Sequence, residues 1–322
     1  MISFNAAALL LVLGFSGNAG AAVQPDALAL LTAAAGGSSV AYEAEFSIEG
    51  SASAKSVSVR YAPPGRYRRE VQGVIVVSDG KKEWVYDRAR GKVWEGDPQA
   101  GSEDNFGLLA ANYELGVSTA EAVAGRPAWR IDIRSRSEAR LSRSIWIDRR
   151  YTLILRSESY RPDGCLLARS SITRQTIPAK PDPGIFEFKA PAGVKVARRA
   201  DPDLMAVEQA KGASGLDPKT PSWLPSGYIF ESLDVLPYRG KKIIHYRYSD
   251  GVNVLSIFQC PPRSRLSLSG KPREKVRIGS SRGFLSWSDE GNVVGWTADR
   301  AKLVLVGPLS LNVLKKIAES VR

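Results

Sequence analysis

The sequence predicts a mainly β protein of the α+β class, built from two antiparallel sheets with few helices. Residues Val40 to Ile48 alternate apolar and polar side chains without a fault, which is the period of a strand with one buried face. Similar short runs recur along the chain and are separated by Pro, Gly and Asp, the residues of tight turns. About 300 residues follow a short leader, and this length suits two domains.

The first domain is expected to begin with a short helix that Pro25-Asp26 opens and Gly36-Gly37 ends. A second helix is predicted over residues 105–115. Turns at Asp79-Gly80 and at Pro162-Asp-Gly164 have the chemistry of hairpin connections. The strands are expected at residues 40–48, 57–61, 66–71, 74–77, 83–86, 93–94, 128–133, 144–148, 153–160, 166–173 and 185–188.

The second domain is predicted as a smaller antiparallel sheet with a helix across one face. Its strands are expected at residues 228–235, 242–248, 252–259, 282–288, 293–298 and 301–306. Ser310 has the chemistry of an N-cap for the closing helix, which buries Val313, Leu314, Ile317 and Val321 on one side. Residues 199–220 are rich in Ala, Gly, Asp and Lys and are interpreted as a linker. The predicted domains are therefore 23–198 and 221–322.

Residues 1–22 have the pattern of a cleavable signal peptide. An apolar run from Ala6 to Phe15, too short to span a bilayer, is followed by the small-residue cleavage pattern Ala19-Gly-Ala21. We therefore expect an exported protein. The two cysteines, Cys165 and Cys260, fall in different predicted domains. They are expected as unpaired thiols, with an interdomain disulfide as the alternative.

The charge balance is strongly basic, with a formal net charge of +12. Twelve arginines between Arg126 and Arg174 accompany only five Asp or Glu residues. In an exported protein this favours anionic lipid, lipopolysaccharide or an acidic protein segment as partner, and not nucleic acid. The alternative is that these arginines lie on solvent-facing strands without a specific role.

The sequence contains no constellation that predicts catalysis. Gly279-Ser-Ser-Arg-Gly283 matches the sequence pattern of a hydrolase nucleophile elbow. It lies between the charged residues Lys275-Val-Arg277 and a predicted strand, however, and is better explained as a hairpin turn. His245 is the only histidine and is expected on the more polar side of its strand, without companions at metal-ligand spacing. No glycine-rich phosphate loop is present. We therefore expect that the protein is not an enzyme, that it has no catalytic residue, and that it binds no metal and no cofactor.

Three phrases in the second domain resemble the C-terminal domain of the sigma-E regulatory family RseB/MucB. They are Thr220-Pro-Ser-Trp-Leu-Pro-Ser-Gly-Tyr228, Tyr248-Ser-Asp-Gly-Val-Asn-Val-Leu-Ser-Ile-Phe258 and Val306-Gly-Pro-Leu309. The first domain resembles the LolA-like fold of that family, an open, curved antiparallel sheet with helices in its hollow. This likeness is best over Val123 to Ile131, Ile145 to Asp148 and Arg156 to Gly164. Residues 56–71 and 260–279 depart from the family pattern.

The resemblance implies a periplasmic negative regulator that binds the periplasmic segment of a single-pass anti-sigma factor. Binding would shield that segment from proteolysis, and a lipid or other amphiphile would release it. The alternative is a periplasmic lipid or lipoprotein carrier of LolA type. A homo-oligomer is among the possible states.

Two groups of residues are the candidate binding sites. An open sheet cannot bury its whole apolar face against two short helices. The uncovered part of that face would therefore form a hollow able to hold acyl chains. The alternative is that these side chains belong to an ordinary sealed core. The candidate ligand-binding residues of this hollow are Tyr42, Phe46, Trp84, Tyr86, Trp94 and Trp146. The candidate partner-binding residues are Trp223, Tyr228 and Tyr248, for which structural packing is the alternative.

Overall fold

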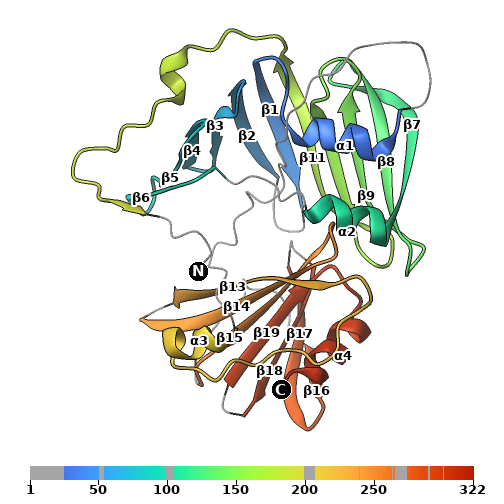
Figure 1. The fold of residues 1–322 in the computed structure, drawn as a ribbon, viewed down its shortest axis with the longest axis vertical. Coiled ribbons are helices and arrows are strands. Elements are labelled where there is room, and N and C mark those ends of the chain that lie inside the picture. Colours follow the sequence, from blue (N-terminus) through green and yellow to red (C-terminus); the bar gives the residue numbers. More distant parts are fainter. Residues whose placement is uncertain are drawn as a thin grey trace.

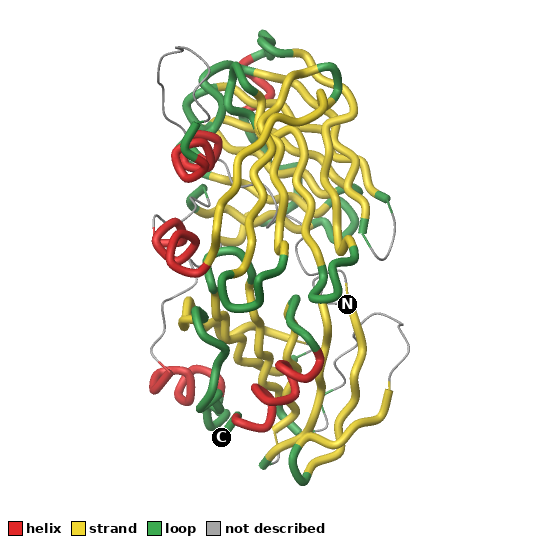
Figure 2. The backbone as a smooth tube through the Cα atoms, turned by 90° about the vertical axis from the view of Figure 1, so that its right-hand side faces the viewer, coloured by secondary structure: helices red, strands yellow, loops and turns green. Residues whose placement is uncertain are grey.

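Two sheets, one in each half of the chain, lie one beyond the other along the long axis of the molecule (Figures 1 and 2). The computed structural model describes residues 25–50, 54–98, 104–198, 207–238, 240–262, 264, 274–288, 291–299 and 301–322. The predicted signal peptide, residues 1–22, lies outside the described residues. Within them, no helix is both long and apolar enough to cross a membrane.

The first sheet has twelve strands in the order β12-β6-β5-β4-β3-β2-β1-β11-β10-β9-β8-β7. The chain leaves the centre at β1, runs outward to β6, crosses to the far edge at β7 and returns to pair β11 with β1. All of its pairs are antiparallel except the one between β12 and β6. The strands are β1 (Tyr42–Glu49), β2 (Lys55–Ala62), β3 (Arg66–Val71), β4 (Val74–Asp79), β5 (Glu83–Asp87), β6 (Lys92–Gly96), β7 (Tyr113–Val123), β8 (Arg126–Ser135), β9 (Leu141–Asp148), β10 (Ile154–Tyr160), β11 (Leu166–Thr176) and β12 (Val196–Arg198).

Two helices cover the β7–β9 side of this sheet (Figure 1). Helix α1 (Ala27–Ala35) begins where the Asp26 carboxylate accepts hydrogen bonds from the amides of Leu28 and Ala29, which confirms the expected helix start at Pro25-Asp26. Helix α2 (Asp104–Asn112) leads directly into β7. Their apolar sides share one buried cluster with the sheet, composed of Ala27, Leu31, Ala34, Leu109, Tyr113, Ile131, Ile133 and Ile147.

The second sheet is wholly antiparallel, in the order β13-β14-β15-β19-β18-β17-β16. Its strands are β13 (Ile229–Tyr238), β14 (Lys241–Ser249), β15 (Val254–Cys260), β16 (Glu274–Ile278), β17 (Ser281–Ser288), β18 (Gly291–Ala298) and β19 (Ala301–Gly307). Helix α4 (Leu311–Ser320) packs Leu314 and Ile317 into the core of this domain, and Ser310 caps it by accepting from the Val313 amide. The expected N-cap and the expected buried side of the closing helix are therefore confirmed.

Several expectations for individual segments are corrected by the structure. The second helix ends at Asn112, and residues 113–123 form an edge strand that was not predicted. Many positions of this strand face solvent and carry polar side chains, so the sequence lacks a clear alternation of apolar and polar residues there. Residues 183–186 form a 3-10 helix where a strand was expected over 185–188, because Pro183 fits its first turn and Asp182 accepts from the Gly184 amide. The strands β12 and β16 were also missed.

The predicted linker, residues 199–220, includes helix α3 (Val207–Ser214), which packs on β13 and β14. Ala210 is fully buried in the core of the second domain, so this part of the segment is held by apolar contact. Lys219 adds polar contacts, because its amide donates to the Tyr246 hydroxyl and to the Gln259 side chain. The remainder of the linker, residues 199–206, lies outside the described residues.

Other small predictions are confirmed. Gly279 and Ser280 form the turn between β16 and β17, as the hairpin interpretation of Gly279 to Gly283 requires. Both cysteines are free thiols, Cys165 exposed and Cys260 buried.

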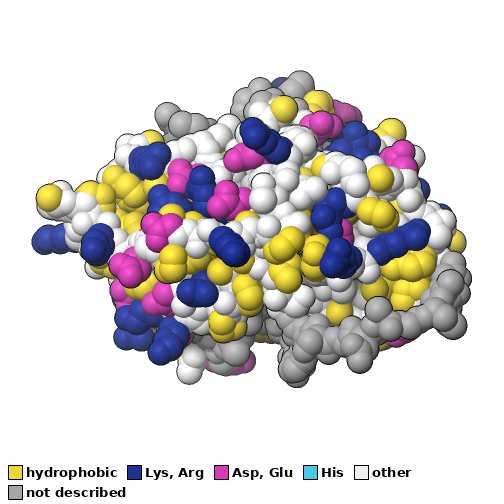
Figure 3. All heavy atoms as spheres, turned by 90° about the horizontal axis from the view of Figure 1, so that it is seen from above, with side chains coloured by type: hydrophobic (Ala, Val, Ile, Leu, Met, Phe, Trp, Pro, Cys, Tyr) yellow, Lys and Arg dark blue, Asp and Glu magenta, His cyan; other side chains and the backbone are white. Residues whose placement is uncertain are grey.

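The arginines of the first sheet are largely paired with carboxylates and stacked on aromatic rings. Arg126 pairs with Asp148, and Arg169 pairs with Glu158. Arg130 and Arg156 both lie over the Trp146 ring, each 5.1 Å from its centroid. The end of the molecule farthest from the second sheet accordingly shows basic, acidic and apolar side chains intermixed (Figure 3).

Candidate functional site: a pocket between the domains

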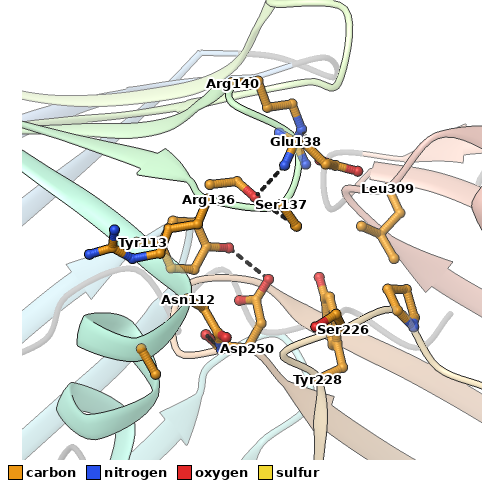
Figure 4. Close-up of a pocket in the computed structure, with 13 residues that line it drawn as sticks. Asn112, Tyr113, Arg136, Ser137, Glu138, Arg140, Ser226, Tyr228, Asp250 and Leu309 are labelled. Atoms are coloured by element: carbon orange, nitrogen blue, oxygen red, sulfur yellow. Dashed lines mark hydrogen bonds and ion pairs between the residues drawn. The ribbon is translucent and has the colours of Figure 1, made fainter.

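The candidate site is a pocket of about 270 Å³ at the junction of the two domains (Figure 4). The first domain contributes the end of α2, the start of β7 and the turn between β8 and β9. The second contributes the turn before β13, the turn after β14 and Leu309, which precedes the N-cap of α4. The lining residues are Ala111, Asn112, Tyr113, Ser135, Arg136, Ser137, Glu138, Arg140, Pro225, Ser226, Tyr228, Asp250 and Leu309.

A buried hydrogen-bond network joins the two domains beside this pocket. The Tyr113 hydroxyl donates to Asp250 Oδ2 at 2.7 Å and accepts from Asn253 Nδ2 at 2.8 Å. The Asn112 amide donates to the carbonyl oxygens of Gly227 and Asp250, at 3.0 Å each. Tyr113 is 2% exposed and Asp250 is 6% exposed, so the bond between them is shielded from water, while the bonds of Asn112 and Asn253 are partly buried. We call Asn112, Tyr113, Asp250 and Asn253 the interdomain latch.

The local sequence explains how the second domain presents its half of the latch. Asp250 begins the turn between β14 and β15, and its Oδ1 accepts from the amides of Val252 and Asn253 at 3.0 and 2.7 Å. Asp and Asn favour such turns because their side chains can hydrogen-bond the following backbone. Gly251 has a φ of +93°, which suits glycine. The turn also directs Val252 against the apolar cluster beneath α1 and α2.

Close approach of the domains depends on Gly227, whose carbonyl accepts from the Asn112 side chain. Its φ is +91°, and a Cβ at this position would lie 2.6 Å from Asn112 Oδ1. The phrase Pro225-Ser-Gly227-Tyr228 therefore has a structural role at the junction.

Charged groups surround the pocket. Arg140 is mostly buried, pairs with Glu138 and donates to the Pro308 carbonyl at 3.5 Å. Arg136 is half exposed and pairs with Glu114 at 3.3 Å. Burial, followed by the nearby Asp250 carboxylate, raises the pKa of both Tyr113 and Tyr228 above its usual range, so both phenols stay protonated at neutral pH. Among the described residues, no group of three or more His, Cys, Asp and Glu side chains could hold a metal ion.

The six candidate ligand-binding residues do not lie together in the structure. Tyr42, Phe46 and Trp146 are buried in one apolar cluster. Trp84 and Tyr86 are half-buried on β5, where Phe188 lies against both rings, with centroids 6.0 and 6.3 Å away. Trp94 on β6 is half-buried and pairs in register with Val85, on the other face of the sheet from Trp84 and Tyr86. The predicted acyl-binding role of these residues stays a prediction.

The three candidate partner-binding residues are largely packed inside the second domain. Tyr248 is 4% exposed and contacts Phe230 edge-on. Trp223 packs on the core, with Lys316 Nζ 3.9 Å from its ring centroid. Tyr228 alone lines the interdomain pocket. Four residues of the site were not singled out from the sequence as site residues: Asn112, Tyr113, Arg140 and Asp250. Asp250 does lie in one of the phrases that resemble the RseB/MucB family.

Comparisons with known proteins show similarity to one family model and to several solved structures. Residues 49–190 match the model of the MucB/RseB N-terminal domain. The whole two-domain arrangement is similar to that of MucB bound to the periplasmic part of MucA, at 20% identity and a TM-score of 0.54, over 88% of this chain and 93% of that chain. Over residues 49–190 the chain therefore matches the MucB/RseB N-terminal domain, and its fold is that of the MucB structures.

Two further MucB structures show the same fold. The Pseudomonas aeruginosa MucA/MucB complex matches at 19% identity and a TM-score of 0.54, over 88% of this chain and 93% of the other. MucB alone matches at 20% identity and a TM-score of 0.53, over 88% of this chain and 92% of the other. No match was found among curated protein sequences. The expected MucB/RseB fold, with an open first sheet and a smaller second domain, is thus confirmed.

Proposed function

We propose that this chain is a periplasmic negative regulator that binds the periplasmic segment of a single-pass anti-sigma factor. The observation that carries the proposal is the two-domain likeness to MucB in complex with the periplasmic part of MucA, together with the family match over residues 49–190. On this proposal the protein acts by binding and not by catalysis.

Binding is proposed to shield the partner segment from a site-1 protease, and a lipid or other amphiphile is proposed to release it. Release requires that the amphiphile favours the partner-free form over the partner-bound form, because a ligand shifts an equilibrium only by its differential affinity. The latch supplies a physical route for such coupling: a ligand that alters the angle between the sheets would have to break buried hydrogen bonds.

A protection assay tests this function. The purified chain without residues 1–22 would be mixed with the periplasmic segment of the host's single-pass anti-sigma factor and the site-1 protease. We expect cleavage to slow in proportion to bound segment and to recover when lipopolysaccharide is added. If the segment binds but is cleaved at the free rate, shielding is wrong. If lipid co-purifies and no segment binds, the carrier alternative is correct.

A further inference from the structure

A second cavity, of about 400 Å³, is lined by described residues of the first domain alone. Its walls come from the segment before β1, from the turn between β2 and β3, and from residues 178–186, which follow β11. The 3-10 helix at the end of that last segment, Pro183–Phe186, packs on β3 and β4.

This cavity lies on the opposite face of the first sheet from Tyr42 and the cluster that buries it. Tyr61 and Tyr67 pair in register on β2 and β3, and both belong to the apolar cluster that contains Tyr42. Their chain neighbours Ala62 and Arg66 also pair in register, and these two residues line the cavity. Successive side chains of a strand point to opposite faces, so the sheet itself separates the cavity from that cluster. We call this space the outer cavity.

The Arg66 guanidinium lines the outer cavity without a carboxylate partner among the described residues. Its hydrogen bond runs from Nη2 to the Pro63 carbonyl at 3.1 Å, and its Nε is buried without an acceptor. Its central carbon lies 5.5 Å from the centroid of the Phe186 ring, which is another wall of the cavity. The cross-strand neighbour Asp79 does not pair with Arg66, because its carboxylate accepts from two amides of the β4–β5 turn. Most N–H donors of this guanidinium therefore have no acceptor in the described part of the chain.

Lys180 adds a second positive charge to the same cavity. Its side chain is exposed and forms no ion pair with a described residue. The nearest carboxylate in the sequence, Asp182, accepts from the Gly184 amide at 3.0 Å and does not line the cavity. No Asp or Glu is among the described residues that line it. An anion here would meet two positive charges and no competing carboxylate.

The remaining wall of the outer cavity is apolar. It consists of four prolines, three alanines, Val40 and Phe186, and Ser39 is the only uncharged polar side chain among the described lining residues. A peptide would leave backbone N–H and C=O groups without side-chain partners there, whereas an alkyl chain carries no such groups. A volume of about 400 Å³ lies near the lower end of the range of ligand pockets, about 300–1,000 Å³, and suits one chain and not a lipid with several.

We propose that the outer cavity binds a single-chain anionic amphiphile. Its carboxylate or phosphate head would lie beside Arg66 and Lys180, and its chain would lie against Phe186 and the prolines. This inference goes beyond the proposed function, because it assigns an amphiphile site on the other face of the sheet from Tyr42, and binding there does not require the anti-sigma segment.

Calorimetric titration of the chain without residues 1–22 tests the proposal, with decanoate as the probe. We expect one decanoate to bind per chain. Octanoate should bind more weakly by about fourfold for each methylene removed, since each buried methylene contributes to affinity. Decanol, which has the chain without the charge, should bind about tenfold more weakly than decanoate. Decyl phosphate, titrated in parallel, shows which of the two head groups the cavity prefers.

Matched substitutions locate the bound probe. Lys180→Gln removes a charge from an exposed side chain, so it should leave folding stability unchanged, weaken decanoate about threefold and leave decanol unaffected. Arg66→Gln should weaken decanoate about tenfold. Ala179→Leu places a larger side chain in the wall of the cavity and should block both probes. Lys189→Gln, which removes an exposed charge that does not line the cavity, is the control and should change nothing.

Three results would overturn the assignment. One is decanoate that binds Ala179→Leu as tightly as wild type, which would place the amphiphile elsewhere in the molecule. Another is equal affinity of Lys180→Gln and Lys189→Gln for decanoate, together with decanol that binds as well as decanoate. The third is the failure of every probe to bind wild type. The proposed shielding of the anti-sigma segment would stand in each case, because the protection assay measures it without an amphiphile.

Discussion

The Tyr113 hydroxyl offers the sharpest test of how the two domains are held together. This hydroxyl donates to Asp250 and accepts from Asn253, and both bonds cross the domain boundary. Tyr113→Phe removes these bonds while the ring keeps its place in the apolar cluster beneath the helices, so no cavity is created.

The size of the effect follows from the bonds that are lost. A hydrogen bond to a charged group contributes about 1.5–3 kcal/mol, and the Asp250 carboxylate loses one such donor. Asn253 keeps a contact with Asp250 at 3.3 Å, which limits the additional loss. We therefore expect the substitution to weaken the docking of the domains by about 2 kcal/mol, while the two Asn112 bonds remain.

Urea unfolding followed by tryptophan fluorescence, with calorimetry as a second probe, measures this change. The wild type should unfold with its two domains coupled, and Tyr113→Phe should separate the transitions. Tyr246→Phe is the matched control, because it should destabilise the second domain without uncoupling it from the first. If Tyr113→Phe changes the free energy of unfolding by less than about 0.5 kcal/mol and leaves the transitions superimposed, the latch does not hold the domains.

Three further predictions concern single residues. Gly227→Ala should cost at least about 2 kcal/mol of stability, measured by urea unfolding, because its φ of +91° and a Cβ 2.6 Å from Asn112 both oppose a side chain. Burial, followed by the positive charge of Arg247, lowers the pKa of His245 to about 3, below its unfolded value of about 6.5. The unfolded state therefore binds the proton first, and stability should fall by about 2 kcal/mol between pH 7 and pH 5, a loss that His245→Gln should abolish. Burial raises the pKa of Cys260 to about 12, so a thiol reagent at pH 8 should modify Cys165 in the folded protein and Cys260 only after unfolding.

Each of these has an outcome that would contradict it. A Gly227→Ala variant as stable as wild type would show that the junction can open without cost. An equal loss of stability with acid in His245→Gln would assign the pH dependence to other groups, since the chain has one histidine. Rapid modification of both thiols in the native protein would contradict the burial of Cys260.

Local patterns in the sequence were sufficient for most of the fold. Alternation over residues 40–48 and helical spacing after Ser310 gave strand and helix correctly, because in each case one face is buried and the other is not. The edge strand β7 was missed because most of its side chains are exposed or half-exposed, and its pairing with β8 decides its conformation.

The candidate site was harder to foresee because it is made by contacts between distant positions. Asn112 bonds to Gly227, which is 115 residues away, and Tyr113 to Asp250, which is 137 residues away. No spacing within either segment signals such a pair. The segments Leu224-Pro-Ser-Gly227 and Tyr248-Ser-Asp-Gly251 lie in phrases that resemble the RseB/MucB family, and the structure shows that turns in both segments contribute to the domain junction.

A pull-down from the host envelope with the tagged chain, in the presence and absence of lipopolysaccharide, tests the central claim most directly. The account predicts recovery of a single-pass anti-sigma factor from the untreated envelope and its loss when the amphiphile is added. Recovery of lipoproteins or lipid without any anti-sigma factor would contradict it.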